Sequence, residues 1–548
     1  METSPLAKRR STRKRRRFPP ASDGISDDAM TSALNAFDYA IVVAYLVGTI
    51  AIGLWIGRRV HSGRDFFLAG RSLPWWAIGF SLVATDIGGT DIIGVGGAAY
   101  AHGLAVANFE WIGCVPAMIL AAFVFIPIFW RAGVYTVPEF LERRFDARIR
   151  VALAACWLVF MACNIGIMLF ASAKMMGVLF GWPVSVSILV TAALVGIYCV
   201  TGGLAAVVYT DVLQCVVMIA GCILVLVLGL IDLGGFDGLM DRLHAVEAAA
   251  SASVDHTQLL LPVDTDSPFP WSGIFFGLAM VLGPAYWFGN QAIIQRSFGA
   301  KSEFEVKAAF VFGALLKNII PVIVAVPGLI ALARFPELRE ADAAFPTLVS
   351  HVLPAGLRGL FLAAFLAALM SSVDSYLNSA ATLITTDIYQ RFFRREATDA
   401  SLLGVGRITT IALIAWGIGF ALYLARLEGT GIYAIFQTLM AFFQGPALAV
   451  LLAGFLWRRA TGTGAFAGFL VGVLTTTTLF ALNQETIYGS LGWRPLFRIA
   501  EPFLYFSVWG FLVAAFVLVV VSLCTPPPSA AKLHGLVFTR RPARTPSV

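Results

Sequence analysis

Apolar runs of about 20 residues recur between residues 39 and 523, each long enough for one helix to cross the hydrocarbon core of a bilayer. Short polar segments separate these runs. The longest polar interruptions, at about 234–270 and from residue 525 onward, leave no soluble domain to be expected beside the spans. The pattern predicts an all-α polytopic membrane protein. About thirteen transmembrane helices are expected, at residues 38–58, 75–101, 104–130, 150–176, 182–200, 206–232, 270–294, 307–333, 355–386, 402–424, 432–457, 462–482 and 502–523.

The composition supports a lipid environment. Hydrophobic residues make up 59% of the 548 residues and charged residues 13%, whereas a soluble globular protein is usually about half apolar and about a quarter charged. All seven cysteines lie inside or beside apolar runs, so a disulfide framework is not expected. The sequence has no CxxC pair, no HExxH motif and no GxxxxGK phosphate loop. These features argue against an enzyme, an ATP-driven pump and a redox carrier.

Arginine and lysine residues gather in alternate loops between the expected spans. The loops of the other side hold few cations, and two of them, at 232–266 and 337–342, are acidic. The positive-inside rule places the cationic loops in the cytoplasm. We therefore expect a multi-pass protein of a bacterial-type inner (plasma) membrane, with the N-terminus outside and the C-terminal tail inside. The cationic loops contain Arg58, Arg59, Arg64 and Arg71, then Arg131, Arg143, Arg144, Arg148 and Arg150, then Arg296, Lys301 and Lys307, then Arg391, Arg394 and Arg395, and then Arg458 and Arg459.

The stretch KRRSTRKRRR at residues 8–17 conflicts with an external N-terminus, because basic tails resist translocation. A translation start at Met30 removes the conflict and is the interpretation we favour, since it leaves a short and nearly neutral N-terminus. Residues 1–29 would then not be translated. A disordered cytoplasmic tail before an inverted first span, and an N-terminal address signal, are the alternatives.

Two expected spans contain residues that interrupt a regular helix. The segment ATDIGGTDIIGVGG at 84–97 places Asp86, Asp91 and five glycines at membrane depth, where an aspartate costs about 2.5–3.5 kcal/mol. The segment LGPAYWFGN at 282–290 interrupts a span five helices further on. Such a pair is typical of an inverted repeat with its binding site at the midplane, although glycine and proline are also common in membrane helices generally. The expected divisions are a tail at 1–37, a leading helix at 38–58, repeats of five spans at 75–232 and 270–457, two further helices within 462–523 and a tail at 524–548.

One face of the expected helix at 355–386 is rich in small and hydroxyl side chains. Ala368, Ser371, Ser372 and Ser375 stand at relative positions 0, 3, 4 and 7, which share one side of a helix. Hydroxyl and carbonyl oxygens are ligands that a hard cation such as sodium prefers. The face therefore indicates either a sodium site or hydrogen bonding to a neighbouring helix.

Six stretches within about residues 38–480 carry a family pattern: RDFFLAGRSLPWWAIGFSLVATDIGG at 64–89, FEWIG at 109–113, RAGVYTVPEFLERRF at 131–145, TGGLAAVVYTDVLQ at 201–214, GNQAIIQRSFGAKS at 289–302 and MSSVDSYLNSAATLITTDIY at 370–389. In this order and spacing they resemble the sodium/solute symporter family and, within it, the sodium/glucose cotransporters. The resemblance implies the leucine-transporter fold with an inverted five-plus-five repeat, alternating access, and sodium bound between the first and eighth core spans. The implied sodium ligands are the backbone oxygens of Ala84, Ile87 and Ala368 and the hydroxyls of Ser371 and Ser372.

The resemblance also implies a substrate site like that of the sugar carriers. The sugar-type residue is kept at Glu110 and Lys317, and the aromatic residue of the inner gate is kept at Tyr286. Glu110 and Lys317 could instead pair only with each other across the bundle. The implied substrate-binding residues are Asp91, Glu110, Tyr286, Lys317 and, approximately, Thr438.

Three positions depart from the sugar-carrying members of the family. This chain has Asp91 where the sugar carriers have an amide residue, Gly283 where they have an asparagine, and Gly113 where they have a serine. The carboxylates of Asp91 and Glu110 could accept several hydroxyl donors or attract a cationic group, which disfavours an anionic substrate unless Lys317 compensates. The expected function is sodium-coupled import of a small polar solute, a sugar or polyol. An amino acid, a vitamin or a carboxylate as substrate, and a membrane sensor without transport, are the alternatives.

Asp374 adds a carboxylate to the hydroxyl-rich helix. Family members with a second sodium site build it from an aspartate matched here by Asp211 and from hydroxyls at the positions of Asp374 and Ser375. Two carboxylates that lie close together do not both stay ionised cheaply without a cation between them. The residues therefore indicate a second sodium ion, which we favour, a proton held by one acid, or a purely structural contact. The expected partners are sodium, the solute and the lipid bilayer, without nucleic acid.

Overall fold

The computed structural model describes residues 35–58, 68–199, 204–250, 255–427, 431–490, 492–499 and 501–538. Within these ranges every regular element is a helix, and β-pairing is limited to two isolated bridges. The basic stretch at 8–17 and the start site expected at Met30 lie outside the described residues, as do the cationic positions Arg59 and Arg64.

Nine helices of the described residues are long and apolar enough to cross a membrane. They confirm the expected polytopic, all-α architecture. These helices are α1 (Ala36–Gly57), the continuous run from η4 (Phe109–Cys114) to α6 (Ile126–Ala132), α8 (Ala147–Phe180), α10 (Leu204–Leu233), α14 (Glu303–Lys317) with α15 (Ile320–Arg334), α17 (Leu357–Thr382) with η8 (Leu383–Phe393), α18 (Asp399–Leu424), α21 (Gly462–Leu482) and α23 (Phe503–Cys524).

Two bent helix pairs raise the number of spans to as many as eleven among the described residues. The helix that begins as α4 (Gly89–His102) is bent by 55° against α3 (Trp75–Asp86), and α20 (Gln444–Leu456) is bent by 42° against α19 (Ile432–Ala441). Two further expected ranges hold shorter apolar helices, so the count of thirteen spans stays a prediction. These shorter helices are α9 (Val184–Cys199) and the pair η6 (Gly273–Leu282) and α12 (Gly283–Gly289).

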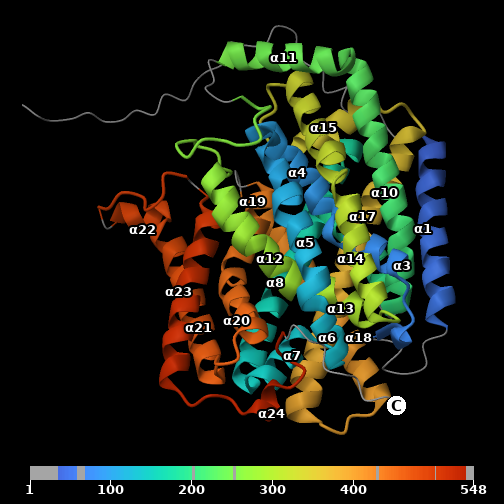
Figure 1. Ribbon diagram of the computed structural model, residues 1–548. Coiled ribbons are helices and arrows are strands. Elements are labelled where there is room, and N and C mark those ends of the chain that lie inside the picture. Colours follow the sequence, from blue (N-terminus) through green and yellow to red (C-terminus); the bar gives the residue numbers. More distant parts are fainter. Residues whose placement is uncertain are drawn as a thin grey trace, which may run out of the picture.

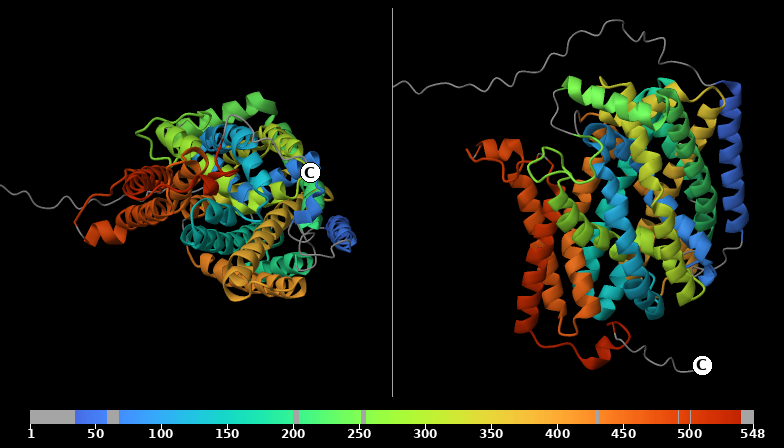
Figure 2. Two further views of the ribbon diagram at one scale, coloured as in Figure 1. Left: turned by 60° about the horizontal axis from the view of Figure 1, so that its bottom comes forward. Right: turned by 45° about the horizontal axis from the view of Figure 1, so that its top comes forward.

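The helices form one bundle with elements attached on two opposite flanks. Figure 1 shows α1 along one flank and α21 and α23 along the other, and both views of Figure 2 agree. The helix α11 (Gly235–Ala250) lies across one end of the bundle, and the short α24 (Ala530–Leu533) lies at the opposite end. We refer to these as the α11 end and the α24 end.

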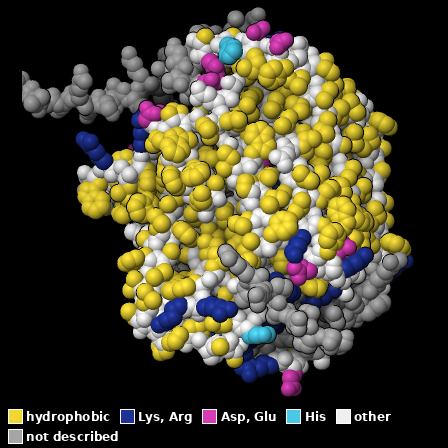
Figure 3. Space-filling view, in the orientation of Figure 1, with side chains coloured by type: hydrophobic (Ala, Val, Ile, Leu, Met, Phe, Trp, Pro, Cys, Tyr) yellow, Lys and Arg dark blue, Asp and Glu magenta, His cyan; other side chains and the backbone are white. Residues whose placement is uncertain are grey.

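The sides of the bundle are apolar. Figure 3 shows hydrophobic side chains over most of the visible face, with charged side chains gathered mainly toward the two ends. Large side chains such as Val47 of α1, Ile231 of α10 and Phe516 of α23 are exposed. Water does not favour so continuous an apolar surface, whereas the hydrocarbon of a bilayer does.

The centre of the bundle is built around two helix breaks. At the first, Ile87 and Gly88 leave helical geometry between α3 and α4, and a Cβ on Gly88 would lie 2.6 Å from Ser372 Oγ of α17. Glycine is therefore required for α17 to approach this break. At the second, Asn290 separates α12 from α13 (Gln291–Phe298) and its side chain accepts a hydrogen bond from Ala292 N at 2.9 Å. Both interruptions expected from the sequence are thus real breaks between helices.

Candidate functional site

Lys317, the last residue of α14, is a buried cation beside the first break. Its side chain is fully inaccessible to solvent, and its Nζ forms ion pairs with the Asp86 carboxylate at the end of α3 and with Glu110 Oε2 of η4, the latter at 2.6 Å. The Nζ also lies 5.5 Å from the centre of the Trp287 ring, a cation–π distance. Glu110 therefore does pair with Lys317, and Asp86 is a third member that the sequence analysis did not assign.

Asp91 lies in the first turn of α4. Its Oδ2 accepts a hydrogen bond from Gly88 N at 2.9 Å, which satisfies a free amide at the start of that helix. The positive end of the helix dipole also favours a carboxylate there. Asp91 and Asp86 consequently flank the same break, one on each helix.

One group of possible metal ligands occurs in the described part of the chain. Ligand atoms of Asp86, Glu110 and Cys114 all lie within 4.8 Å of one another. Both carboxylates already have the Lys317 ammonium as their cation. The group therefore fits an internal ion-pair cluster better than a site for a resident metal.

A cavity of about 50 Å³ adjoins this cluster, and Asp91, Glu110 and Tyr286 line it together. We call it the central cavity. Its volume corresponds to about one or two water molecules, so the walls are closely packed in this state. From α19 the lining includes Gln437, whereas Thr438 is not among the described residues that line the cavity.

Gly113 and Gly283 bring η4 and α12 together at the edge of the central cavity. A Cβ built on Gly283 would lie 2.1 Å from the Gly113 carbonyl oxygen, and one on Gly113 would lie 2.8 Å from Leu278 Cδ1. An asparagine or serine side chain has no room at these positions without a shift of the helices. The two glycines therefore set the shape of this edge of the cavity.

The residues expected to bind sodium meet where α17 crosses α3. Ser371 Oγ donates to the Ala84 carbonyl oxygen at 2.7 Å, and Ser372 Oγ lies 2.9 Å from the Thr85 carbonyl oxygen. Both hydroxyls also lie within 3.2 Å of the Ala368 carbonyl oxygen. The structure thus brings together Ala84, Ala368, Ser371 and Ser372, and Ile87 follows in the adjoining break.

The residues expected at a second site lie one turn further along α17. Ser375 Oγ lies 2.9 Å from Thr85 Oγ1 and 3.2 Å from Asp374 Oδ1. Asp211 Oδ2 of α10 accepts a hydrogen bond from Ser81 Oγ at 2.5 Å and lies 3.5 Å from Thr85 Oγ1. All of these side chains are buried.

Arg296 of α13 joins this second group, and the sequence analysis missed it. Its Nη2 lies 2.7 Å from Ser375 Oγ and 3.9 Å from Asp211 Oδ2. We counted Arg296 among the loop cations because it follows the expected end of its span, but its side chain is only 1% exposed. The family-like stretch GNQAIIQRSFGAKS could have indicated a buried arginine. A new helix begins after Asn290, and Arg296 lies on that helix in the interior of the bundle.

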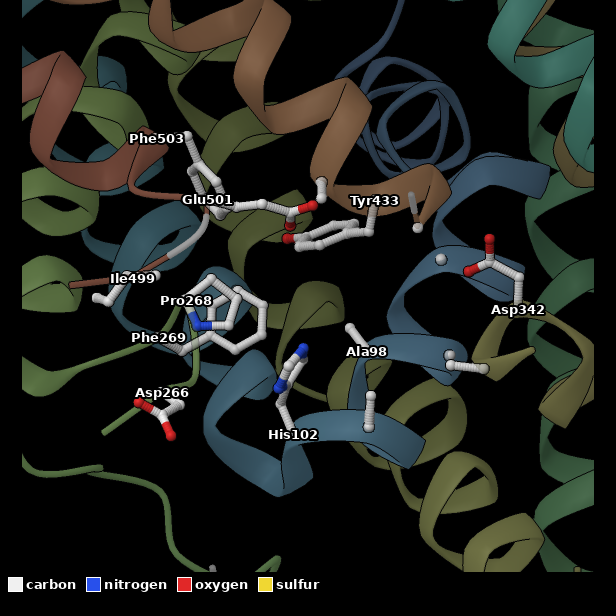
Figure 4. A pocket seen from close by; sticks show the side chains of 16 residues that line it. Ala98, His102, Asp266, Pro268, Phe269, Asp342, Tyr433, Ile499, Glu501 and Phe503 are labelled. Atoms are coloured by element: carbon white, nitrogen blue, oxygen red, sulfur yellow. The ribbon is translucent and has the colours of Figure 1, made fainter. Parts of the chain in front are cut away.

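A larger cavity of about 310 Å³ lies between the C-terminal end of α4, the N-terminal end of α19 and the segment before α23. We call it the vestibule. Figure 4 shows Glu501, Tyr433 and Phe503 on one side of it and Phe269 and His102 on another. Its lining mixes aromatic rings with acidic and histidine side chains.

Three aromatic rings separate the vestibule from the central cavity. Phe269 lines the vestibule, Phe109 lines the central cavity, and Tyr433 lines both. The Phe109 ring centre lies 5.2 Å from that of Tyr433 and 5.7 Å from that of Phe269, both in edge-to-face contact. Movement of these rings would therefore be needed to connect the two cavities.

Asp342 lines the vestibule and holds the start of α19. Its Oδ2 accepts a hydrogen bond from Ile432 N, the first residue of α19, at 3.0 Å. Burial raises the pKa of Asp342 to about 6, although the bond from Ile432 lowers it. Burial also raises the pKa of Glu501 in the same cavity, and the negative charge of Asp342 adds to that shift.

Ion pairs link the helices at the α24 end. Glu142 of α7 (Val137–Arg144) binds Arg150 of α8 at 2.5 Å and Arg391 of η8 at 2.7 Å. Asp387 of η8 binds the Nε of the same Arg150 at 2.5 Å and accepts a hydrogen bond from Thr136 Oγ1 at 3.0 Å. Burial opposes ionisation of Glu142, but hydrogen bonds from Arg391 and Arg150 outweigh it and lower the pKa. The network ties α7, α8 and η8 together below the candidate sites.

The model of the sodium:solute symporter family matches residues 66–472 of this chain. Sodium/glucose cotransporter 4 of Homo sapiens is 33% identical over 542 residues, which cover 93% of this chain and 79% of that protein. A sodium/mannose cotransporter of Bos taurus is 33% identical over 553 residues, which cover 94% of this chain and 92% of that protein. These relatives are transporters, not enzymes.

The arrangement of helices is also found in solved transporters. A sodium-coupled sialic acid symporter, solved in a substrate-bound outward-open state, superimposes with a TM-score of 0.77 at 21% identity, over 90% of this chain and 99% of that one. The expected leucine-transporter fold is thereby confirmed. The chain belongs to the sodium:solute symporter family, and sodium is its coupling ion.

Proposed function

We propose that the protein imports a sugar or polyol together with sodium by alternating access, and that the solute binds in the central cavity. Relatives named for glucose and mannose transport support a sugar-like solute. The observation that carries the proposal is that the central cavity and the hydroxyls of α17 meet at one helix break. Asp86 and Asp91 line the cavity on either side of Gly88, and Ser372 approaches Gly88 from α17.

This shared break gives a physical basis for coupling. Two ligands are coupled when both favour the same state of one element. A sodium ion held by α17 and the end of α3 would fix the backbone at the break. The carboxylates of Asp86 and Asp91 are attached to that backbone, so their position for the solute would depend on the ion.

The proposed ion ligands are oxygens that already approach one another. They are the backbone oxygens of Ala84, Ile87 and Ala368 and the hydroxyls of Ser371 and Ser372. The two hydroxyls lie 2.7–3.2 Å from carbonyl oxygens of α3 and α17. A rotation about the Cβ–Oγ bond would turn their lone pairs toward an ion, as a hard cation requires.

The proposed solute contacts are Asp91, Glu110 and Tyr286. Carboxylate oxygens accept hydrogen bonds from several hydroxyl groups, and an aromatic ring packs against the apolar face of a sugar. Lys317 acts by holding Glu110 and Asp86 in place, and Thr438 remains a predicted contact beside the lining residue Gln437. The central cavity must widen to admit a solute, which is consistent with alternating access.

A solute that carries an amine is a second candidate. Asp86, Asp91 and Glu110 place three carboxylates at the central cavity, against the single ammonium group of Lys317. The excess of acidic groups would favour a cationic group over an anionic one. An anionic solute such as a carboxylate is disfavoured for the same reason.

Uptake by purified protein in proteoliposomes tests the proposal. Labelled hexoses, polyols, amino acids and amines would be supplied with an inward sodium gradient, and with potassium replacing sodium as the control. We expect sodium-dependent uptake of a labelled hexose or polyol, and we expect unlabelled sugars to inhibit that uptake by competition. Sodium-dependent uptake of amines alone would favour the second candidate. Uptake of no solute in either gradient would contradict both.

A further inference from the structure

Arg296 occupies the place where the sequence predicts a second cation. Its guanidinium Nη2 lies 2.7 Å from Ser375 Oγ and 3.9 Å from Asp211 Oδ2, and its Nη1 donates to the Ala292 carbonyl oxygen at 2.5 Å. The guanidinium therefore contacts a hydroxyl and a carboxylate that a second sodium ion would need as ligands.

The oxygens around the guanidinium are also engaged with one another. Asp211 Oδ2 accepts from Ser81 Oγ at 2.5 Å, and Thr85 Oγ1 lies 2.9 Å from Ser375 Oγ. Ser375 Oγ in turn lies 2.7 Å from the Ser371 carbonyl oxygen. A sodium ion entering this group would have to displace the guanidinium and break these hydrogen bonds together.

A cationic side chain is energetically favoured over a bound sodium ion at this position. Asp211 is fully buried, and a buried carboxylate is costly unless a counter-ion accompanies it. Arginine stays charged at every physiological pH. A cation that belongs to the chain loses no translational freedom on binding, whereas an ion taken from solution does.

We propose that Arg296 is the permanent counter-ion of Asp211 and takes the place of a second sodium ion, so that one sodium accompanies each solute. The proposal rests on the sodium symport proposed above and opposes the second sodium that the sequence favours at Asp211, Asp374 and Ser375. In this arrangement Asp374 acts through Ser375, whose Oγ lies 3.2 Å from Asp374 Oδ1.

The first test counts sodium ions on the unmodified full chain. Equilibrium binding of radiolabelled sodium to the purified protein should saturate at one ion per chain. With no membrane potential, a tenfold sodium gradient should support at most about tenfold accumulation of a neutral solute, against about a hundredfold with two ions. Two ions per chain would overturn the proposal. No bound sodium and no sodium-dependent uptake would contradict the symport itself.

The second test changes the arginine. Arg296→Gln should admit a second sodium and raise the count to two, whereas Arg296→Lys keeps a cation and should leave it at one. Arg144→Gln is the matched control, since Arg144 is a buried arginine whose guanidinium binds the carbonyl oxygens of Gly454 and Trp457. A folded Arg296→Gln protein that still binds one sodium would overturn the proposal. If that variant does not fold, the count on the unmodified chain decides.

Discussion

At the scale of single residues, Lys317 carries the charge balance of the central cavity. It is paired with Asp86 and Glu110 and is fully buried. Removing one partner of a buried ion pair leaves the others uncompensated, which typically costs about 3–5 kcal/mol. Lys317 is therefore needed for the stability of the site before any contact with a solute is considered.

We expect Lys317→Ala to abolish uptake and to lower the thermal unfolding temperature of the purified protein. Adding Glu110→Gln should recover part of the lost stability, because one unpaired carboxylate is removed. Thermal unfolding of the two variants and the wild type, with and without sodium, provides the measurement. Wild-type stability and uptake in Lys317→Ala would show that the buried pairs have no role.

Ser372 links the proposed ion site to the first helix break. Ser372→Ala removes one oxygen ligand of the ion, while alanine preserves the helix. The sodium concentration for half-maximal uptake should therefore rise at least about tenfold. Uptake measured against sodium concentration gives this value. Ser379→Ala is the matched control, since Ser379 lies on the same helix and bonds Gln295 Oε1 at 2.8 Å. The same sodium requirement in Ser372→Ala and wild type would mean that the ion binds elsewhere.

Residue types predicted much of the candidate site, but not its pairings. The spacing of Ser371 and Ser372 showed a polar helix face, and the glycines near Asp91 showed a helix break. The partner of Lys317 at Asp86 depends on where α14 ends relative to α3, which no local pattern encodes. Arg296 was misjudged for a similar reason, because only the break at Asn290 returns the chain to the interior.

At the scale of elements, Asp342 connects a short loop helix to the start of α19. The folded protein raises the pKa of this acid from its ordinary value of 3.8 to about 6, mainly through burial. The folded state therefore binds the proton more tightly than the unfolded state. Its contribution to stability is greatest below about pH 4 and is lost as the pH rises through about 6.

We expect Asp342→Asn to reduce the loss of thermal stability between pH 4.5 and pH 7.5, because asparagine still accepts from Ile432 N but does not titrate. Glu501 shifts in the same direction, so part of the slope should remain. Asp266→Asn serves as the control, since that side chain is largely exposed in the same cavity. Identical pH dependence in Asp342→Asn and wild type would contradict the assignment.

At the scale of the whole molecule, the distribution of arginines indicates which end of the bundle faces the cytoplasm. Glu142, which binds Arg150 and Arg391, belongs to α7, and α7 lies at the α24 end of the bundle (Figure 1). By the positive-inside rule, we propose that this end faces the cytoplasm. The vestibule would accordingly open to the outside, where a solute for import is found.

Labelling of Cys524 tests this orientation. It is the exposed residue among the described free cysteines, and it ends α23. A membrane-impermeant maleimide should label it only after cells are permeabilised, and Cys524→Ser should lose that labelling. Labelling of Cys524 in intact cells would reverse the proposed orientation.

Hydropathy predicted the membrane bundle but not the lengths of all its spans. The run at 182–200 forms a helix of 16 residues, and the run at 270–294 is divided among η6, α12 and α13. Mean hydropathy measures how well a segment suits lipid. Where a helix breaks depends on packing against neighbours, as Gly88 and Ser372 illustrate.

The contact between Gly113 and Gly283 constrains how this transporter can change its specificity during evolution. A Cβ at Gly283 would lie 2.1 Å from the opposite backbone, so an asparagine introduced there alone would be overpacked and destabilising. A serine at Gly113 meets Leu278 instead. A larger side chain at either glycine therefore requires compensating changes in the facing helix, so single mutations that enlarge the site for another solute should be tolerated better elsewhere in the cavity wall.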